Sequence, residues 1–346
     1  MSSQTAELIL SAISLPRDQY RHAGAPTEWW WHVGTLKAAN GRTFGFEINA
    51  TGELSFGFTQ IEITDVANQV NYQQVTPIVP LPSNWAEDDP SKPWRVNLGP
   101  LGGPGGNVSM SAIGGNPLDM KVEAEFVDTA SSKHCKLALG LFQEGAPLLV
   151  WGTGHEEVDP KGKTPITQNN YYYSLTHLRA SGVLQIGAEK FEVKGLTWID
   201  HEYGAFPKDS PGKPVVWTLQ DMQLSNGVHL SNFTEFGIAP KAGIPMKSHA
   251  TVLRNGKSTF VKSVTTPLAP TFTSAKGVVY YLKYNVEIND PLLQATFTVT
   301  SLFPNQVFRS PGNEQDVYEG VAKCEGTFGD IKEPVTGTAW IEQNLK

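Results

Sequence analysis

Apolar and polar residues alternate along most of this chain in short runs, and turn signals separate the runs. Such alternation is typical of β-strands with one buried face. The 33 glycines and 24 prolines are frequent enough to interrupt long helices. Helical periodicity is confined to residues 6–15, for which we expect one short helix. The pattern therefore predicts an all-β fold.

Three pairs of alternating runs flank short turns and predict antiparallel hairpins. The paired runs are residues 29–36 with 43–48, residues 182–186 with 190–193, and residues 280–288 with 294–302. Two further stretches, residues 77–93 and 99–106, are predicted to be loops. The second is rich in glycine, but it lacks the third glycine of a dinucleotide fingerprint and no helix-forming run follows. We therefore interpret it as a flexible loop.

An internal repeat indicates two similar halves. Trp31 lies nine residues before the turn Asn40-Gly41, and Trp217 lies nine residues before Asn226-Gly227. Both elements recur at the same offset of 186 residues. Because repeats of this length indicate duplicated architectures, we predict two domains of barrel size, residues 1–190 and residues 191–346.

Composition and charge exclude several classes of partner. The 346 residues carry a formal net charge of −7, with no basic run long enough to follow a phosphate backbone, so nucleic acid is not expected. No stretch approaches the ~18 consecutive apolar residues of a membrane span, and residues 8–15 lack a basic n-region. We expect a soluble, cytoplasmic protein. The two cysteines, Cys135 and Cys324, lie far apart and show no paired metal-ligand spacing; nothing indicates an oligomeric state.

The segment from Thr197 to Gly204 concentrates ionisable residues among aromatic ones. Asp200, His201 and Glu202 lie between Trp198 and Tyr203. Burial raises the pKa of an aspartate, which can keep it protonated near neutrality as a general acid. Strand alternation places Asp200 and His201 on opposite faces, so they share one site only at a bulge or strand end. The alternative interpretation is a hydrogen-bonded structural cluster.

Aromatic clusters supply apolar surface, and common catalytic signatures are absent. In the run Trp29 to Trp31, alternation places Trp30 on one face and the other two tryptophans on the opposite face. At least one of them must therefore face a cavity or solvent. There is neither a Gly-x-Ser-x-Gly elbow nor a His-Glu-x-x-His helix, and the eight histidines are scattered. His155-Glu156-Glu157 reads as a solvated charge cluster. We therefore expect no metal and no cofactor.

Several motifs together resemble those of one family. The opening carries Arg21-His22-x-Gly-x-Pro-x-Glu28-Trp29-Trp30, the middle carries Tyr172-Tyr173-Ser174-Leu175-Thr176-His177 and Trp198-Ile-Asp200-His201, and the end carries Tyr318-Glu319-Gly320 and Gly337-Thr-Ala-Trp-Ile-Glu342. The set resembles the AttH-like, lipocalin-like proteins related to carotenoid 1,2-hydratase (hydroxyneurosporene synthase). The resemblance spans nearly the whole chain, and its Trp-x-Asp-His segment is the most specific part.

This resemblance implies two lipocalin-like antiparallel β-barrels in tandem, with a substrate cavity in or between them. Family members include hydratases that add water to an isoprenoid double bond and relatives that cyclise polyenes. The resemblance implies that Asp200 corresponds to the proton donor of the hydratases. This chain differs from them in having Glu202-Tyr203 after the Asp-His pair, and, unlike for the secreted relatives, we expect no signal peptide.

These observations lead to one principal hypothesis: a cofactor-independent enzyme that acts on a carbon–carbon double bond of a hydrophobic isoprenoid or polyene, by hydration or cyclisation. Asp200 would protonate the alkene, His201 would orient Asp200, and Tyr203 would position water. The expected substrate-binding residues are Glu28, Trp29, Trp30, Tyr173, Trp198 and Trp217. The alternatives are a pericyclic cyclase that works by shape alone, a carrier or sensor of apolar molecules, and a polysaccharide-binding protein.

Overall fold

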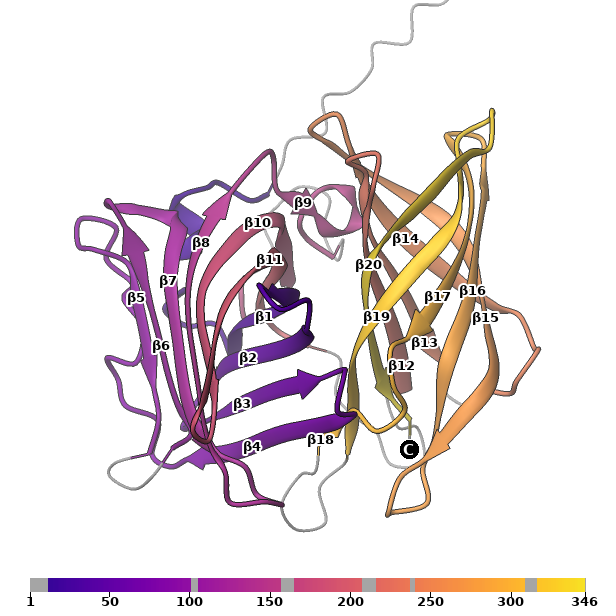
Figure 1. Cartoon of the computed structure of the whole chain (residues 1–346). Helices are drawn as coiled ribbons and strands as arrows, with labels where there is room; N and C mark the ends of the chain where they lie inside the picture. Colours follow the sequence, from indigo (N-terminus) through magenta and orange to yellow (C-terminus); the bar gives the residue numbers. More distant parts are fainter. Residues whose placement is uncertain are drawn as a thin grey trace, which may run out of the picture.

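The computed structural model describes residues 12–100, 105–156, 165–206, 216–236, 240–308 and 316–345. Within these ranges the chain forms two antiparallel β-sheets that lie side by side (Figure 1) and contains no α-helix. Of two short 3-10 turns, η1 (Arg17–Gln19) precedes the first strand and η2 (Val150–Gly152) lies between two later strands. Most of the helix predicted for residues 6–15 falls outside the described ranges, as do residues 101–104 of the glycine-rich loop and residues 157–164.

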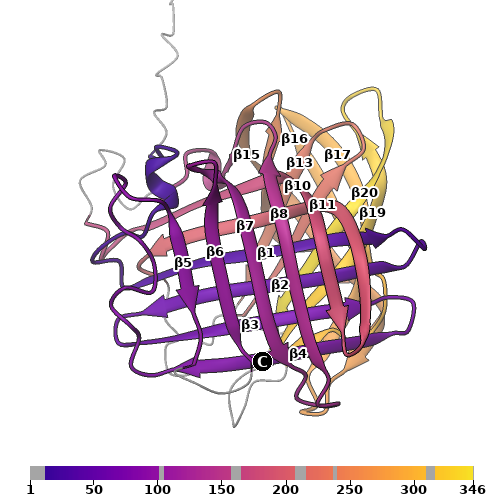
Figure 2. The same cartoon turned by 60° about the vertical axis from the view of Figure 1, so that its left-hand side comes forward.

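The first sheet has eleven strands in the order β4-β3-β2-β1-β11-β10-β8-β7-β6-β5, with β9 paired to β10. It folds over on itself so that β5 to β8 cross β1 to β4, as Figure 2 shows, and large side chains such as Trp30, Phe46 and Phe126 fill the space between. The strands are β1 (Thr27–Ala38), β2 (Thr43–Glu53), β3 (Phe56–Asp65), β4 (Val70–Ile78), β5 (Arg95–Leu98), β6 (Asn107–Ile113), β7 (Asn116–Val127), β8 (His134–Gln143), β9 (Leu148–Leu149), β10 (Asn170–Ile186) and β11 (Glu189–Gly204).

The second sheet has nine strands in the order β17-β16-β15-β14-β13-β12-β20-β19-β18, and a further pairing of β17 with β19 closes it. Its interior is filled by residues such as Tyr284, Phe297 and Ile341. The strands are β12 (Val216–Leu224), β13 (His229–Phe236), β14 (Met246–Arg254), β15 (Lys257–Thr273), β16 (Val279–Asp290), β17 (Leu293–Ser301), β18 (Val307–Phe308), β19 (Val317–Phe328) and β20 (Glu333–Asn344). The fold is thus all-β, with two lipocalin-like barrels, as predicted.

The three predicted hairpins are present, and the repeat has a structural counterpart. The turn after Trp31 joins β1 to β2, and the turn after Trp217 joins β12 to β13. In each sheet this first strand also pairs with the last long strand, β11 or β20. The two barrels are therefore built on the same strand plan.

The division between the barrels lies later in the chain than the predicted boundary at residue 190. Strand β11 pairs with β1 along its length and with β10, so the first sheet extends to Gly204, and the second begins at Val216. The turn near residue 190 connects two strands of the same hairpin, because β11 must return beside β1 to complete the first barrel.

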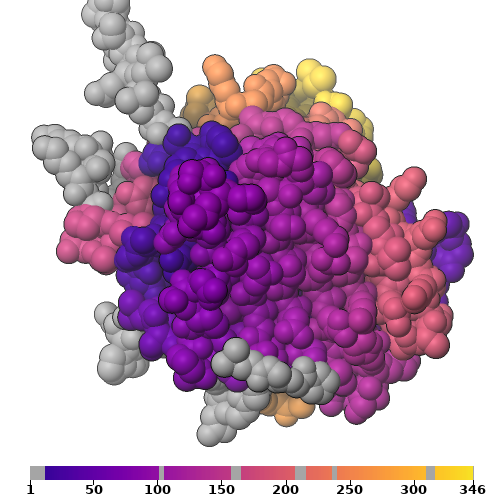
Figure 3. All heavy atoms as spheres, turned by 90° about the vertical axis from the view of Figure 1, so that its left-hand side faces the viewer, coloured from indigo at the N-terminus to yellow at the C-terminus, as the bar shows by residue number. Residues whose placement is uncertain are grey.

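The two barrels contact each other through an apolar cluster that includes Val33 and Trp198 of the first sheet and Val321 and Trp340 of the second. The amide of Gln223 also donates to the backbone carbonyls of Thr176 (2.8 Å) and Thr197 (3.0 Å) across this contact. On the opposite side of the first barrel, the surface is continuous and convex wherever the described residues are visible (Figure 3). Among the described residues, no helix is long and apolar enough to cross a membrane.

Candidate functional site

Strand β11 carries most of the predicted chemistry and separates two environments. Its register with β1 runs without interruption from Val193 to Gly204, so successive side chains point to alternate sides. The register shift of this region lies in β10, between Leu175 and Leu178. Asp200 therefore faces the second barrel and His201 faces the interior of the first. The two residues do not share one site, because no bulge occurs between them.

On the side that faces the second barrel, Asp200 is held by hydrogen bonds and is only 7% exposed. The Ser174 hydroxyl donates to Oδ1 of Asp200 at 2.5 Å, and the Trp198 indole N–H donates to the same oxygen at 2.7 Å. Burial raises the pKa of Asp200 to about 6, against the lowering effect of hydrogen bonds from Ser174, Trp198 and Tyr172. Asp200 therefore holds its proton far closer to neutrality than an exposed aspartate does.

The second barrel places two more carboxyl groups opposite Asp200. Asp221 is buried on β12, and Glu342 on β20 accepts a hydrogen bond from the Trp217 indole N–H at 2.7 Å. Burial raises the pKa of Asp221 well above its ordinary value, and the charge of Asp200 raises it further. Burial and the charge of Asp200 raise the pKa of Glu342 to about 7. These three groups bind protons more strongly together than each would alone.

The three carboxyl groups belong to a larger acidic layer between the sheets, whose remaining members are Glu47, Glu62, Glu202 and Glu319. Burial is the largest cause that raises the pKa of each of these four. None of the ion pairs among the described residues involves a member of this layer. Burial therefore makes each of these acids harder to ionise than an exposed carboxyl group.

Aromatic side chains surround the acids. Trp29 and Tyr172 lie directly across from Glu202, in the row next to Asp200, and both are partly exposed. Trp198, Asp221 and Trp340 line a small cavity between the two sheets. This side of β11 therefore combines buried carboxyl groups of raised pKa with apolar surface next to a small cavity between the barrels.

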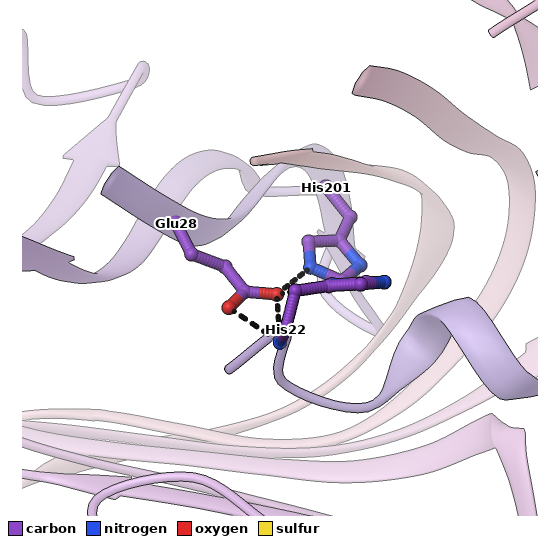
Figure 4. A group of neighbouring side chains, drawn as sticks. All are labelled: His22, Glu28 and His201. Carbon is purple, nitrogen blue, oxygen red and sulfur yellow. Dashed lines mark hydrogen bonds and ion pairs between the residues drawn. The ribbon is translucent and has the colours of Figure 1, made fainter. Parts of the chain in front are cut away.

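On the interior side of the first barrel, His201 belongs to a separate cluster. Its Nε2 lies 2.9 Å from Oε1 of Glu28, and Nδ1 of His22 lies 2.8 Å from the same oxygen (Figure 4). Trp30 stacks on the ring of His201, and Tyr203 stacks on that of His22. Burial opposes ionisation of Glu28, but hydrogen bonds from His201 and His22 lower its pKa to about 2.

The residues predicted from the sequence thus divide between two places. Asp200, Trp198, Trp29 and Trp217 lie between the barrels, whereas His201, Tyr203, Glu28, Trp30 and Tyr173 lie on the interior side of the first barrel. Sequence reasoning missed Asp221, Ser174, Tyr172 and the role of His22. The available signal for Asp221 was a lone acidic residue in an otherwise uncharged strand, Val216–Leu224.

Comparison with known proteins gives a consistent result. A family model described as AttH-like matches residues 107–344. Among solved structures, the chain is similar to a candidate AttH protein from Nitrosomonas europaea (19% identity, TM-score 0.74, covering 97% of this chain and 98% of that one). It is also similar to kievitone hydratase from Nectria haematococca, with 16% identity and a TM-score of 0.72 over 99% of this chain and 95% of that one. A third similar structure is CghA solved with Sch210972, with 12% identity and a TM-score of 0.50 over 92% of this chain and 89% of that one.

The family match confirms the resemblance drawn from the motifs, and the structural matches confirm the fold. At such low identities a structural match shows the fold alone. No curated protein matches the sequence.

Proposed function

Because this chain belongs to the AttH-like family, we propose that it is an enzyme that protonates a carbon–carbon double bond of a hydrophobic isoprenoid or polyene and completes the reaction by hydration or cyclisation. The observation that carries the proposal is Asp200: a buried carboxyl group, hydrogen-bonded on one oxygen, with its pKa raised to about 6 between two barrels. Similarity to a hydratase of the same fold supports it.

Asp200 suits the role of general acid. A general acid works best when its pKa lies near the working pH, because it is then both protonated and able to release its proton. The donors from Ser174 and Trp198 both reach Oδ1 and would stabilise the carboxylate that remains after proton transfer. Burial and the neighbouring acids would favour the return of the proton, which completes the cycle.

The surrounding aromatic rings suit the carbocation that protonation creates. A cation over the face of an aromatic ring gains roughly 0.5 to 2 kcal/mol when both are desolvated. Trp198 and Tyr172 lie beside Asp200, and Trp31 pairs with it across β1. Trp30, expected to bind the substrate, and Tyr203, expected to position water, lie on the other side of their strands. Trp31 and Tyr172 are the aromatic residues on the side of Asp200.

The second half of the reaction needs a group that accepts a proton from water. In hydration, the alkene takes a proton from Asp200, water forms a bond to the cationic carbon, and the released proton passes to a carboxylate. Asp200 itself, now ionised, or Asp221 across the contact can accept it. In cyclisation a second double bond of the substrate attacks the cation in place of water, and the new carbocation then loses a proton from a neighbouring carbon to the same carboxylate. Neither route transfers electrons to or from the protein, so no redox cofactor is needed.

The test is to isolate the hydrophobic molecules that co-purify with the protein, identify them by mass spectrometry, and assay related polyenes in D₂O. Wild type is expected to release product with one deuterium on carbon. Asp200→Asn is expected to lose about 10²- to 10⁴-fold in rate, whereas Asp330→Asn, at an exposed turn of the second barrel, should keep full activity. Full activity in Asp200→Asn would refute the acid assignment. Stoichiometric binding without turnover in both proteins would instead identify a carrier.

A further inference from the structure

The cluster of His22, Glu28 and His201 on the interior side of the first barrel is not used by the proposed reaction. Three different segments supply it: His22 precedes β1, Glu28 begins β1, and His201 lies on β11. One oxygen of Glu28 faces both ring nitrogens, at 2.8 Å and 2.9 Å (Figure 4). One nitrogen or oxygen of each of the three side chains lies within 4.8 Å of the others.

The hydrogen bonds of a neutral His201 depend on which of its two ring nitrogens carries the proton. The Tyr173 hydroxyl has one proton and contacts two acceptors, the backbone carbonyl of Asp18 at 3.2 Å and Oε1 of Gln19. When the hydroxyl donates to one of these two acceptors, Nδ1 of His201, 3.0 Å away, donates to the hydroxyl oxygen. The lone pair of Nε2 is then left pointing at the carboxylate of Glu28. Such a contact is repulsive unless a proton or a cation lies between the two atoms.

The far nitrogens of both histidines have oxygen partners, as in the outer shell of metal sites. Nε2 of His22 lies 3.5 Å from Oδ1 of Asp18, and Nδ1 of His201 lies 3.0 Å from the hydroxyl of Tyr173. Histidine ligands of metals nearly always have such a partner on the second nitrogen, which fixes the ring. Trp30 at 4.4 Å and Tyr203 at 3.5 Å between ring centroids hold the imidazole planes in place.

From this geometry we propose that His22, Glu28 and His201 bind one divalent transition-metal ion, for which zinc is the best match. Zinc takes imidazole nitrogens at about 2.0 to 2.1 Å and carboxylate oxygens at about 2.0 to 2.2 Å in a tetrahedron. Neighbouring ligand atoms then lie about 3.4 Å apart. The two nitrogens need to move from Glu28 by only about half an ångström to admit the ion. Two imidazoles and one carboxylate favour zinc over calcium or magnesium, which prefer oxygen ligands.

The ion would join the N-terminal segment to the barrel. His22 lies on the segment that follows η1, whereas Glu28 and His201 lie on adjacent strands. Among the described residues, the ion pairs of Glu28 are those with these two histidines. A bound cation would neutralise this buried carboxylate and stabilise the folded chain by mass action.

The experiment uses the tag-free full chain, stripped of metal with a chelator and then titrated with Zn²⁺ in competition with a chromophoric chelator. Co²⁺ serves as a second probe, because its visible absorption reports the coordination geometry. The test variants are His22→Gln, Glu28→Gln and Tyr173→Phe. His134→Gln is the matched control, because His134 pairs with Glu125 on the surface of the same barrel. Circular dichroism checks that each variant is folded.

Wild type and His134→Gln are expected to bind one equivalent and to melt at a higher temperature with zinc than without it. Loss of a ligand in His22→Gln or Glu28→Gln should weaken binding at least 100-fold and abolish the cobalt spectrum. Tyr173→Phe should weaken it about 10- to 100-fold. His22→Gln decides the question if Glu28→Gln does not fold, because His22 lies outside the strands. If wild type binds zinc no more tightly than His22→Gln, the proposal is wrong and the cluster shares a proton instead.

Discussion

Substitution of Glu62 by glutamine provides a direct test of the buried acidic layer. Glu62 lies on β3, is 0% exposed, and accepts hydrogen bonds from Thr64 Oγ1 at 3.0 Å and Asn71 Nδ2 at 2.9 Å. Burial raises its pKa to about 8, against these two hydrogen bonds. Glutamine has the shape of the protonated acid. It can keep both contacts, because its amide oxygen accepts from Asn71 and its amide nitrogen can donate to the hydroxyl of Thr64.

The sign and size of the effect follow from the two pKa values. The folded chain keeps the proton of Glu62 up to a pH of about 8, whereas the unfolded chain releases it near its ordinary value of 4.5. Between these values the unfolded state binds fewer protons, so the stability of the wild type falls as pH rises. Each pH unit costs about 1.4 kcal/mol, so the interval from pH 5 to pH 8 costs roughly 4 kcal/mol. Glu62→Gln does not have this loss. The variant should match wild type within about 1 kcal/mol at pH 5 and exceed it by roughly 3 to 4 kcal/mol at pH 8.

The assay is urea unfolding at pH 5, 6, 7 and 8, followed by tryptophan fluorescence, with transition midpoints compared at each pH. Glu125→Gln is the control, because Glu125 is an exposed carboxylate paired with Lys136 at 2.8 Å. Its hydrogen bond with Lys136 is the largest cause that lowers its pKa. The control should gain nothing as pH rises. A Glu62→Gln advantage that stays constant from pH 5 to pH 8, or that shrinks, would refute the view that this layer holds protonated acids.

Two further predictions follow from single contacts. Ser174→Ala removes a 2.5 Å hydrogen bond that lowers the pKa of Asp200. The alkaline limb of the plot of kcat/KM against pH should therefore move upward by about one pH unit. An unmoved limb would argue against Asp200 as the acid. His32 is 0% exposed with neither ring nitrogen hydrogen-bonded among the described residues, and burial lowers its pKa to about 3. The unfolded state binds a proton at His32 below pH 6.5 that the folded state does not bind, so wild type loses stability as the pH falls. The free energy of unfolding of His32→Leu relative to wild type, measured in urea, should therefore be about 2 kcal/mol higher at pH 5 than at pH 8. An equal difference at the two pH values would contradict this.

The fold could be predicted from the sequence because its information is local. Alternation and the Asn-Gly turns mark hairpins such as β1–β2, whose partners are neighbours in the chain. The limit of the first barrel was harder to place, because β11 pairs with β1 at the far end of that half. The turn near residue 190 has the same local chemistry as a turn between domains, so only the long-range pairing distinguishes the two.

The candidate site was predictable only in part, for the same reason. Alternation correctly places Trp198 and Asp200 on one face of β11, but the facing Asp221 and Glu342 come from another sheet, and no sequence spacing links them to Asp200. Likewise, His201 and Glu28 are 173 residues apart in sequence and 2.9 Å apart in space. Spacing rules for metal ligands depend on ligands from one turn or helix, so they do not detect this cluster.

Asp200 and His201 are neighbours on β11, but they belong to two different clusters on opposite faces of the strand. Asp200 lies among other buried acids and burial raises its pKa to about 6, whereas His201 lies against a carboxylate that hydrogen bonds keep ionised. A cation near Asp200 would favour its ionised form and remove the proton that the proposed reaction requires. The separation of histidine from aspartate by the strand itself maintains this difference, because the β-sheet places the imidazole on the side away from the acidic layer. The motif thus gives neighbouring residues opposite electrostatic environments, and the proposed acid depends on the histidine lying on the far side of the strand.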